Sequence, residues 1–499
     1  MKGFFSPIPA ALPLLLWKTP PGLEQVLAQE GVPFEVVRDA HPFVFRGSRY
    51  IVFDGRVTPR ATLASMLTAE HVAIDVDAIR REELSDPFAS LLDTRATRAS
   101  WPVGFHRVSE RVARRPRASI RRRVVGRLRS AVTAAGGAWV RLAPFPYPYR
   151  SAFSFRADLD EPVPEDYLRF AAAREPLADC CTHFVSTHAY SHHPAVLRDL
   201  GAHDAQSHGH FHHVYRDAEA NRVNLERAHR ILAGWGIEAT GFAAPHGRWS
   251  PGLDDVMEDF GYRYSSDFQL GYDDYPFFPW KGDRFSRVLQ IPVHPVCEGL
   301  FIEAGIGEGQ VIGDYLASVV EARLSAGELA VAYGHPERRL GRMPEVMAAL
   351  ARVVEESSLV WRATFTSIAR WWRWRAERRW LVIPREAGRI EIQFSDWDDE
   401  YPMAVEIHRG AFSASIPVTG PRMILSLGNL VYERSNDGAE LPEPPMIERP
   451  APSLKNAVRA AIDWETVTPL GEIPATTLPN RVKRGLRWWK HRQGRARAS

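Results

Sequence analysis

The chain has 499 residues, of which 45% are hydrophobic and 11% aromatic, a composition that indicates a folded protein and excludes a disordered chain. This length exceeds what one ordinary core supports, so about two to four domains are expected. The formal net charge of +3 hides two basic stretches, residues 107–129 and 481–497, without which the remainder is acidic.

The cysteines and the N-terminus indicate the compartment. Cys180, Cys181 and Cys297 are too few for a disulfide framework and show no C-x-x-C spacing. The N-terminal apolar run is interrupted by prolines and lacks a small-residue cleavage site, so no signal peptide is expected. No stretch reaches the roughly 18 apolar residues of a membrane span. These features predict a cytoplasmic protein.

Residues 1–105 predict a small α/β domain. Strand-like apolar runs alternate there with a helical segment that has Pro21 near its start and Gly31 at its end. Residues 106–149 are interpreted as a basic and proline-rich linker that ends in "APFPYPYR". The arginines at 107–129 are expected to pack on the acidic body or to contact phosphate. No nucleic acid partner is expected, because no aromatic platform or nucleic-acid module accompanies them.

Residues 150–378 alternate short β-like runs with helical segments. This order predicts parallel strands covered by helices, in an open sheet or a barrel. The run "WWRWR" at 371–375 is expected to pack between this unit and the next rather than to stack on sugar. Residues 379–435 are typical of antiparallel strands and predict a small β domain.

Residues 436–499 predict a proline-rich linker followed by a basic tail. The tail spaces Val482, Leu486 and Trp489 as one helical face among lysines and arginines. A basic amphipathic helix of this kind suits peripheral contact with an anionic membrane, which would be the inner face for a cytoplasmic protein. The alternative hypothesis is a solvated, disordered tail.

The stretch "SAFSFRADLD", residues 151–160, carries the first chemical signal. A strand period of two sends Ser154, Arg156, Asp158 and Asp160 to one face, so both carboxylates can serve one site. The alternative is a strand end whose acids face solvent or cap the next helix.

A second signal lies in "QSHGHFHH", residues 206–213. His208 and His212 are four residues apart, which places them on one face if the segment is helical. One aspartate and two histidines form an open three-ligand site that suits a catalytic zinc ion. A histidine-rich surface loop is the alternative interpretation. His335, at the end of the apolar run in "LAVAYGHPERR", is a candidate proton donor for a site at strand ends.

Together these stretches resemble the polysaccharide deacetylases, a family of metal-dependent de-N-acetylases. "FRADLD" is similar to the first motif, "HGHFH" to the H-x-x-x-H metal motif, "FAAPHG" to the third and "AYGHP" to the last histidine motif. The resemblance covers residues 150–375 and implies a distorted (β/α) barrel of seven or eight strands. The full expectation is an α/β protein in which this barrel is flanked by the small N-terminal α/β domain and the small C-terminal β domain.

The resemblance also implies roles. Asp158 would be the general base that activates water, while Asp160, His208 and His212 would hold a divalent metal ion, zinc in the first instance. His335 would be the acid that protonates the leaving amine. The third motif usually carries an arginine that orients the catalytic aspartate, but Ala243 stands there, and Arg156 or Arg248 could replace it.

The expected function is removal of an N-acetyl group from an amino sugar of a surface polysaccharide or a lipid-linked glycan precursor. Two alternatives stay open. The same chemistry could act on another amide, such as an N-formyl sugar or a non-sugar C–N bond. The protein could also be a non-catalytic glycan-binding or assembly protein, which the Ala243 substitution would favour.

Overall fold

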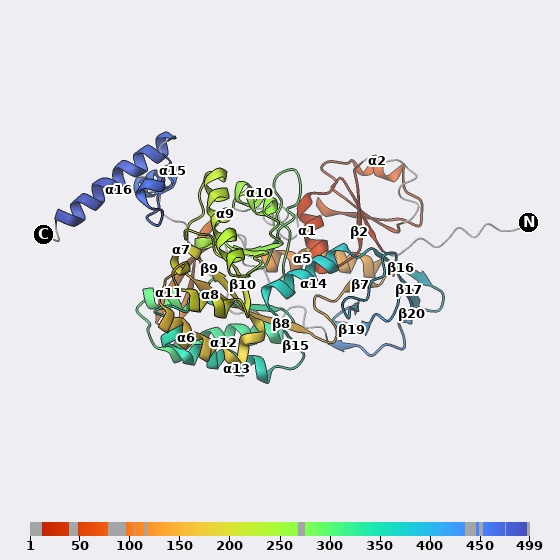
Figure 1. Ribbon diagram of the computed structural model, residues 1–499. Coiled ribbons are helices and arrows are strands. Elements are labelled where there is room, and N and C mark those ends of the chain that lie inside the picture. Colours follow the sequence, from red (N-terminus) through yellow and green to blue (C-terminus); the bar gives the residue numbers. More distant parts are fainter. Residues whose placement is uncertain are drawn as a thin grey trace, which may run out of the picture.

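The computed structural model describes residues 12–38, 48–77, 96–103, 105–113, 117–267, 275–434, 446–448, 453–474 and 476–496. The chain forms an α/β protein. A central unit of parallel strands and helices is flanked by a parallel sheet from the N-terminal part and by antiparallel sheets from the C-terminal part (Figure 1). The predicted fold class is confirmed.

The central unit is a distorted barrel. Its strands follow the order β13, β12, β11, β10, β9, β8, β14, and β15 also pairs with β8. Every pairing is parallel. β13 and β14 stand at the two ends of this order. A hydrogen bond of 2.9 Å from the His294 N–H, just after β13, to the Val331 carbonyl on β14 links these two ends. The bounds are β8 Ser151–Leu159, β9 Cys181–Val185, β10 Asp204–Ser207, β11 Gly241–Ala243, β12 Tyr264–Ser266, β13 Leu289–Gln290, β14 Leu329–Gly334 and β15 Val360–Arg362.

Helices cover the outer face of these strands. The side chains of Phe153, Phe155, Ala157 and Leu159 on β8 lie in the core between strands and helices, as the alternation predicted. Their neighbours on the other face are therefore left for the barrel interior. The helices of this unit are α6 Pro164–Ala173, η2 Glu175–Cys180, α7 Thr187–Tyr190, α8 Pro194–Leu200, α9 Ala218–Gly234, η3 Pro245–Gly247, α10 Pro251–Asp259, α11 Glu298–Glu303, α12 Gly309–Ser325, η4 Leu340–Arg342 and α13 Pro344–Glu356; α14 Phe365–Glu377 follows β15.

The N-terminal sheet is parallel, with strand order β2, β1, β3, β4. Its helix α1 begins at Pro21 and ends before Gly31, whose φ of 69° is the left-handed conformation that glycine favours, as predicted. The bounds are β1 Leu14–Trp17, α1 Pro21–Glu30, β2 Phe34–Val37, β3 Tyr50–Phe53, α2 Arg60–Ala64 and β4 Val72–Asp75.

Residues 106–149 differ from the expected linker, because they contain β6 His106–Ala113, α5 Arg117–Ala134 and β7 Trp139–Leu142. The high arginine content of α5 obscured its apolar stripe, which consists of Ile120, Val124, Leu128 and Val132, all buried. Its arginines pack on the body, where Arg121 pairs with Glu30 and Arg122 with Glu328. The division into domains stays a prediction.

The C-terminal sheets are antiparallel. One has the order β16, β17, β20, and another has the order β21, β19, β18, β7, so a strand that precedes the barrel pairs with one that follows it. A third sheet joins β22, β5 and β6. The bounds are β5 Ala96–Val103, β16 Trp380–Arg385, β17 Arg389–Phe394, β18 Ala404–Arg409, β19 Phe412–Pro417, β20 Arg422–Ser426, β21 Glu433–Arg434 and β22 Met446–Glu448.

Helix α14 joins the barrel to the flanking sheets. Its tryptophans Trp371, Trp372 and Trp374 are buried, as expected for "WWRWR". The Trp371 indole N–H donates to the Pro144 carbonyl at 2.7 Å. These tryptophans belong to one core that also includes side chains of the N-terminal sheet, the barrel interior and the C-terminal sheets. The three parts therefore pack as neighbours around a shared interior.

The N-cap of α14 gives a stability prediction. The Thr364 hydroxyl accepts a hydrogen bond from the Ser367 N–H at 3.3 Å. Thr364→Ala should lower the free energy of unfolding by about 1 kcal/mol, because an N–H at the helix start loses its partner. Urea unfolding followed by tryptophan fluorescence measures the loss. Thr364→Ser keeps the hydroxyl and is the control; equal destabilisation by both substitutions would contradict the cap.

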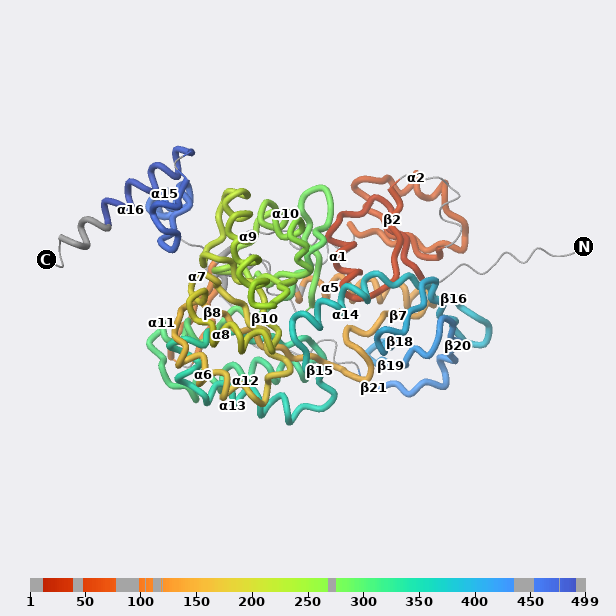
Figure 2. The backbone as a smooth tube through the Cα atoms, viewed as in Figure 1, coloured from red at the N-terminus to blue at the C-terminus, as the bar shows by residue number. Residues whose placement is uncertain are grey.

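The last described segment contains α15 Leu454–Ala461, η5 Leu470–Glu472 and α16 Leu478–Ala496. This segment lies on the side of the molecule away from the N-terminal sheet, with α15 near α9 and α16 extending outward from the body (Figures 1 and 2). None of the helices in the described part of the chain combines the length and the apolar content that crossing a lipid bilayer requires.

Candidate active site

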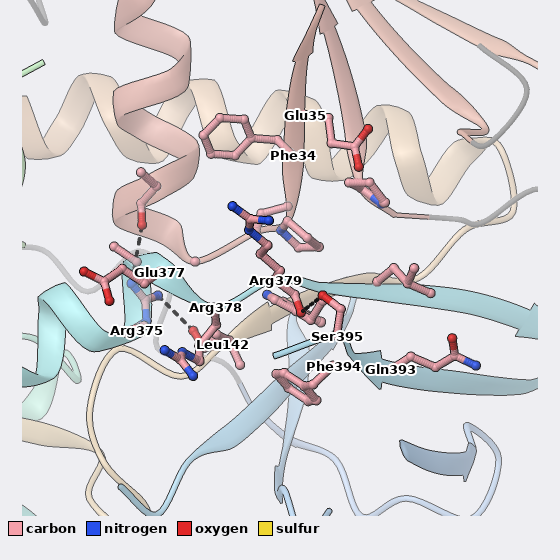
Figure 3. A pocket seen from close by; sticks show the side chains of 18 residues that line it. Phe34, Glu35, Leu142, Arg375, Glu377, Arg378, Arg379, Gln393, Phe394 and Ser395 are labelled. Atoms are coloured by element: carbon pink, nitrogen blue, oxygen red, sulfur yellow. Dashed lines mark hydrogen bonds between the residues drawn. The ribbon is translucent and has the colours of Figure 1, made fainter. Parts of the chain in front are cut away.

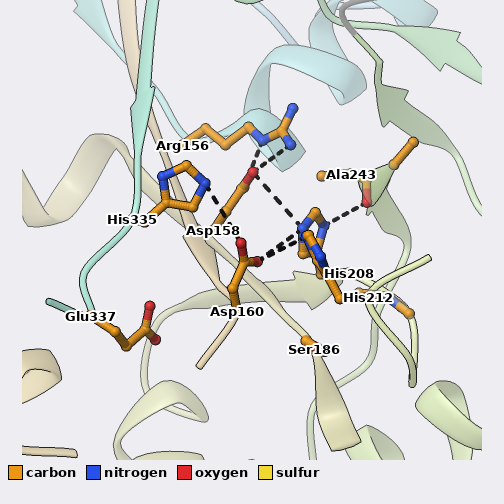
Figure 4. A network of polar contacts seen from close by, with 12 residues as sticks. Arg156, Asp158, Asp160, Ser186, His208, His212, Ala243, His335 and Glu337 are labelled. Carbon is orange, nitrogen blue, oxygen red and sulfur yellow. Dashed lines mark hydrogen bonds and ion pairs between the residues drawn. The ribbon is translucent and has the colours of Figure 1, made fainter. Parts of the chain in front are cut away.

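The carboxyl ends of three barrel strands bring the predicted site residues together (Figure 4). Asp158 lies near the end of β8, and Asp160 follows that strand directly. His208 follows β10, and His335 follows β14. Because the strands are parallel, their carboxyl ends meet at one edge of the barrel, where ligand sites of such folds occur.

Asp160, His208 and His212 form a group that can hold a metal ion. Asp160 Oδ1 lies 3.2 Å from Nε2 of His208 and 3.2 Å from Nε2 of His212. The three ligand atoms lie within 4.8 Å of one another. Among the described residues, no hydrogen-bond donor reaches this Asp160 oxygen.

The hydrogen bonding of His208 and the pKa of His212 suit the binding of a metal ion. His208 Nδ1 lies 2.7 Å from the Ala243 carbonyl and donates to it, so His208 Nε2 carries the lone pair that faces the site. Burial lowers the pKa of His212 to about 4, which leaves that imidazole neutral. A carboxylate and two imidazole lone pairs that face one another are the donor set of an open site for a divalent metal ion.

The loop that carries these histidines is not helical. Residues 208–216 are irregular backbone after β10, so the helical spacing weighed for the H-x-x-x-H pattern does not apply. Gly209, with φ 81°, turns the chain in a conformation that glycine favours. Asn224 on α9 holds the loop by accepting from the Phe211 N–H at 2.7 Å. A held turn thus brings His212 back beside His208.

The other clustered histidines point away from the metal group. His210 Nδ1 lies 3.0 Å from the Thr187 hydroxyl on α7. His213 Nε2 lies 3.2 Å from Asp463 Oδ1 in the C-terminal segment. The His203 ring lies 5.8 Å from the ring of His183. They support the loop and the core rather than the site.

Arg156 takes the position beside Asp158. Its Nε lies 2.7 Å from Asp158 Oδ1 and its Nη2 2.6 Å from Oδ2, a two-point ion pair on one face of β8. Its Nη1 donates to the Ser266 carbonyl at 2.8 Å. Burial alone would raise the pKa of Asp158, but the Arg156 guanidinium holds it below its ordinary value. Arg248, the other candidate, does not pair with Asp158, and its buried Nε has no hydrogen-bond partner among the described residues.

His335 is oriented by a carboxylate that the sequence analysis missed. Its Nδ1 lies 2.7 Å from Glu298 Oε1, and its Nε2 lies 3.6 Å from Asp160 Oδ2. Burial alone would lower the pKa of His335, but the charge of Glu298 raises it well above its ordinary value. The imidazole therefore carries a proton that Nε2 can donate. Glu298 opens the short helix α11 in a stretch without a motif, so no sequence signal marked it.

Glu337 and Tyr190 are two further polar residues beside the cluster. Glu337 is only 4% exposed, and one of its oxygens accepts from the Tyr190 hydroxyl. Burial raises the pKa of Glu337 to about 9, which keeps the carboxyl neutral. Its position two residues after His335 in "GHPER" was a signal that could have drawn attention to it.

A cavity of about 780 Å³ lies elsewhere, between α1, the end of α14 and strands β16 and β17 (Figure 3). Phe34, Glu35, Arg378 and Arg379 contribute to its wall. Arg375 donates to the Leu142 carbonyl at 2.9 Å there. None of the strand-end residues lines this cavity, and its wall holds no histidine or cysteine. The chemistry therefore points to the barrel edge.

Comparisons with solved structures give matches at low identity. A protein from Mycobacterium smegmatis assigned as a polysaccharide deacetylase is 21% identical with a TM-score of 0.40, over 46% of this chain and 93% of its own. One from Pseudomonas aeruginosa PAO1 is 23% identical with a TM-score of 0.39, over 45% and 91%. A CE4 family pseudoenzyme from Bacillus anthracis is 12% identical with a TM-score of 0.32, over 45% and 66%.

No protein-family model and no curated protein sequence matches the chain. The chain thus has structural matches to polysaccharide deacetylases and to a CE4 family member over 45% to 46% of its length.

Proposed function

We propose that the protein is a metal-dependent hydrolase that removes an acyl group, acetyl in the first instance, from an amino sugar. The substrate would be a surface polysaccharide or a lipid-linked glycan precursor. The observation that carries this proposal is that the three candidate metal ligands have a carboxylate, Asp158, and a protonated imidazole, His335, beside them. The Asp158 carboxylate lies 4.0 Å from Nε2 of His208, and His335 Nε2 lies 3.6 Å from Asp160.

The residues divide the work of cleaving an amide. Asp160, His208 and His212 would hold the ion, which when bound polarises the acyl carbonyl and lowers the pKa of a water molecule. Asp158 would take a proton from the attacking water, in an orientation fixed by Arg156. His335 would give its proton to the nitrogen as the C–N bond breaks, because an amide anion is a poor leaving group. The products are a carboxylate and a free amine.

Metal content tests the proposal first. Elemental mass spectrometry of the purified full chain should find about one divalent ion per chain, with zinc the expected metal. Asp160→Ala and His208→Ala should lose it while staying folded, because a three-ligand site does not survive removal of a ligand. His210→Ala, in the same loop but bonded to Thr187, is the matched control and should keep the ion.

The same samples test the reaction. The natural chain should release acetate from N-acetylglucosamine oligomers, and the two metal-free variants should not. A natural chain that holds no divalent ion after zinc addition and dialysis would end the hydrolase proposal. Release of formate from N-formyl sugars, or of acetate from acylated amines other than sugars, would redirect it to another amide substrate.

A non-catalytic glycan-binding protein is the second candidate. The observation that favours it is the two-point pairing of Asp158 with Arg156, because a carboxylate with both oxygens engaged and a lowered pKa is a weaker base. This candidate predicts that the natural chain binds metal and an N-acetylated oligosaccharide but releases no acetate.

We also propose that the protein acts at the cytoplasmic face of a membrane. Cys180, Cys181 and Cys297 are buried free thiols, which suits a reducing compartment. The tail from 481 to 497 holds eight basic residues and no acidic one, which suits an anionic surface.

A further inference from the structure

Helix α16 turns a basic side toward the segment that precedes it, between Glu465 and Ile473. Lys483 is only 2% exposed, and its Nζ lies 3.7 Å from Glu465 Oε1. Arg487 Nη1 lies 3.2 Å from the same oxygen and donates to the Thr468 carbonyl at 2.7 Å. Arg484 donates to the Ile473 carbonyl at 3.2 Å. These cations hold the helix in place, which the sequence analysis did not anticipate.

The apolar side of α16 consequently faces outward. Its side chains are Leu478 at 74% exposed, Val482 at 40%, Leu486 at 41% and Trp489 at 56%. Spacings of four, four and three residues place them in one stripe along the helix. A soluble helix normally buries such a stripe against its own core, so this one is available to a partner.

Helix α15 adds a second apolar stripe of the same kind. Leu454 is 82% exposed and Val458 is 45% exposed, one helical turn apart. Lys455 and Arg459 are exposed on the same helix. Neither 453–461 nor 478–496 contains an acidic residue. The outward surface of the two helices therefore combines aliphatic side chains, one tryptophan and positive charge.

We propose that this α15–α16 unit, residues 453–496, binds the surface of an anionic membrane through these apolar stripes. Aliphatic side chains would enter the boundary of the acyl chains, and the cations beside them would meet lipid phosphates. Charge complementarity selects this occupant: a second copy of the chain would bring like charges together across the contact. The proposal rests on the membrane location proposed above and specifies the surface that makes the contact, but it is independent of the reaction at the barrel.

The unit is fixed next to the candidate active site. Asp463 Oδ2 accepts from the Arg216 N–H at 3.1 Å, and Asp463 Oδ1 lies 3.2 Å from His213 Nε2. The hydroxyls of Tyr215 and Thr468 lie 2.5 Å apart. His213 directly follows the candidate ligand His212. A membrane bound by this unit would thus lie on the side of the molecule that carries the histidine loop (Figure 2).

Vesicle binding by the full chain tests the proposal. The chain should co-sediment with vesicles of phosphatidylcholine mixed with phosphatidylglycerol and bind pure phosphatidylcholine vesicles about tenfold or more weakly. The double variant Leu486→Glu with Trp489→Glu should lose about tenfold or more in affinity for the mixed vesicles, because it places charge in the stripe. Both side chains are largely exposed, whereas the helix is held by Lys483 and Arg487, so the helix should stay attached.

The matched control is Phe412→Glu with Ile424→Glu. These residues are 50% and 57% exposed on the C-terminal sheets, so the control adds the same charge to exposed apolar positions elsewhere. It should bind mixed vesicles like the natural chain. Equal losses in both double variants, or equal binding to both kinds of vesicle, would overturn the proposal. A stripe that dimerises the chain instead, detected by light scattering as a mass halved in Leu486→Glu with Trp489→Glu, would overturn it as well.

Discussion

Asp158→Asn should reduce acetate release from N-acetylated oligosaccharides by about 10²–10⁴-fold, the usual contribution of general acid–base catalysis. The amide keeps the shape of the carboxylate but cannot take a proton from water. Metal content should not change, because Asp158 Oδ2 lies 4.0 Å from His208 Nε2 and is not one of the three ligand atoms. Acetate release and elemental mass spectrometry on the same sample measure both quantities.

Two results would contradict this prediction in different ways. Undiminished acetate release by the variant would mean that another group activates the water. Loss of the ion together with the activity would mean that Asp158 supports the ligands rather than the chemistry. His210→Ala serves again as the control, because it changes the histidine loop without touching the site.

Arg156→Met should destabilise the protein by about 3–5 kcal/mol, since it leaves a buried carboxylate without its charge partner. Arg156 is 1% exposed and Asp158 3% exposed, so water cannot replace the guanidinium. Urea unfolding measures the loss of stability. Arg248→Met, at the other arginine considered for this role, should destabilise the protein less than Arg156→Met, because Arg248 does not pair with Asp158.

A double variant separates lost charge pairing from lost packing. Arg156→Met combined with Asp158→Asn removes both charges, so part of the stability lost in Arg156→Met should return. If the double variant were as unstable as the sum of the two single variants, the ion pair would not be the cause. Acetate release should stay low in both variants that carry Arg156→Met.

The sequence predicted the parts of the site that follow from local patterns. The alternation in β8 correctly placed Arg156 with Asp158 on the inner face, because a strand has a fixed period of two. His335 was found because it ends a buried apolar run. Which arginine pairs with Asp158 was open, since the choice depends on the path of the loop after β11.

Other features depend on contacts between distant segments and left no local signal. Glu298 reaches His335 only because α11 packs beside the end of β14, and its own neighbours show no motif. Helical spacing was not the reason that His208 and His212 meet, since Gly209 and Asn224 shape a loop there. In α5, arginines that form ion pairs in the folded chain made a helix resemble a linker.

The pairing of β7 with β18 limits the order in which the chain can fold during its synthesis. β7 ends at Leu142, and its partner Val405 is made only after the whole barrel. At about 5–20 residues per second, a ribosome needs on the order of ten seconds or more to cover that distance. The unpaired backbone groups of β7 must wait that long for their partner strand, so this flanking sheet can close only after every strand of the barrel has been made.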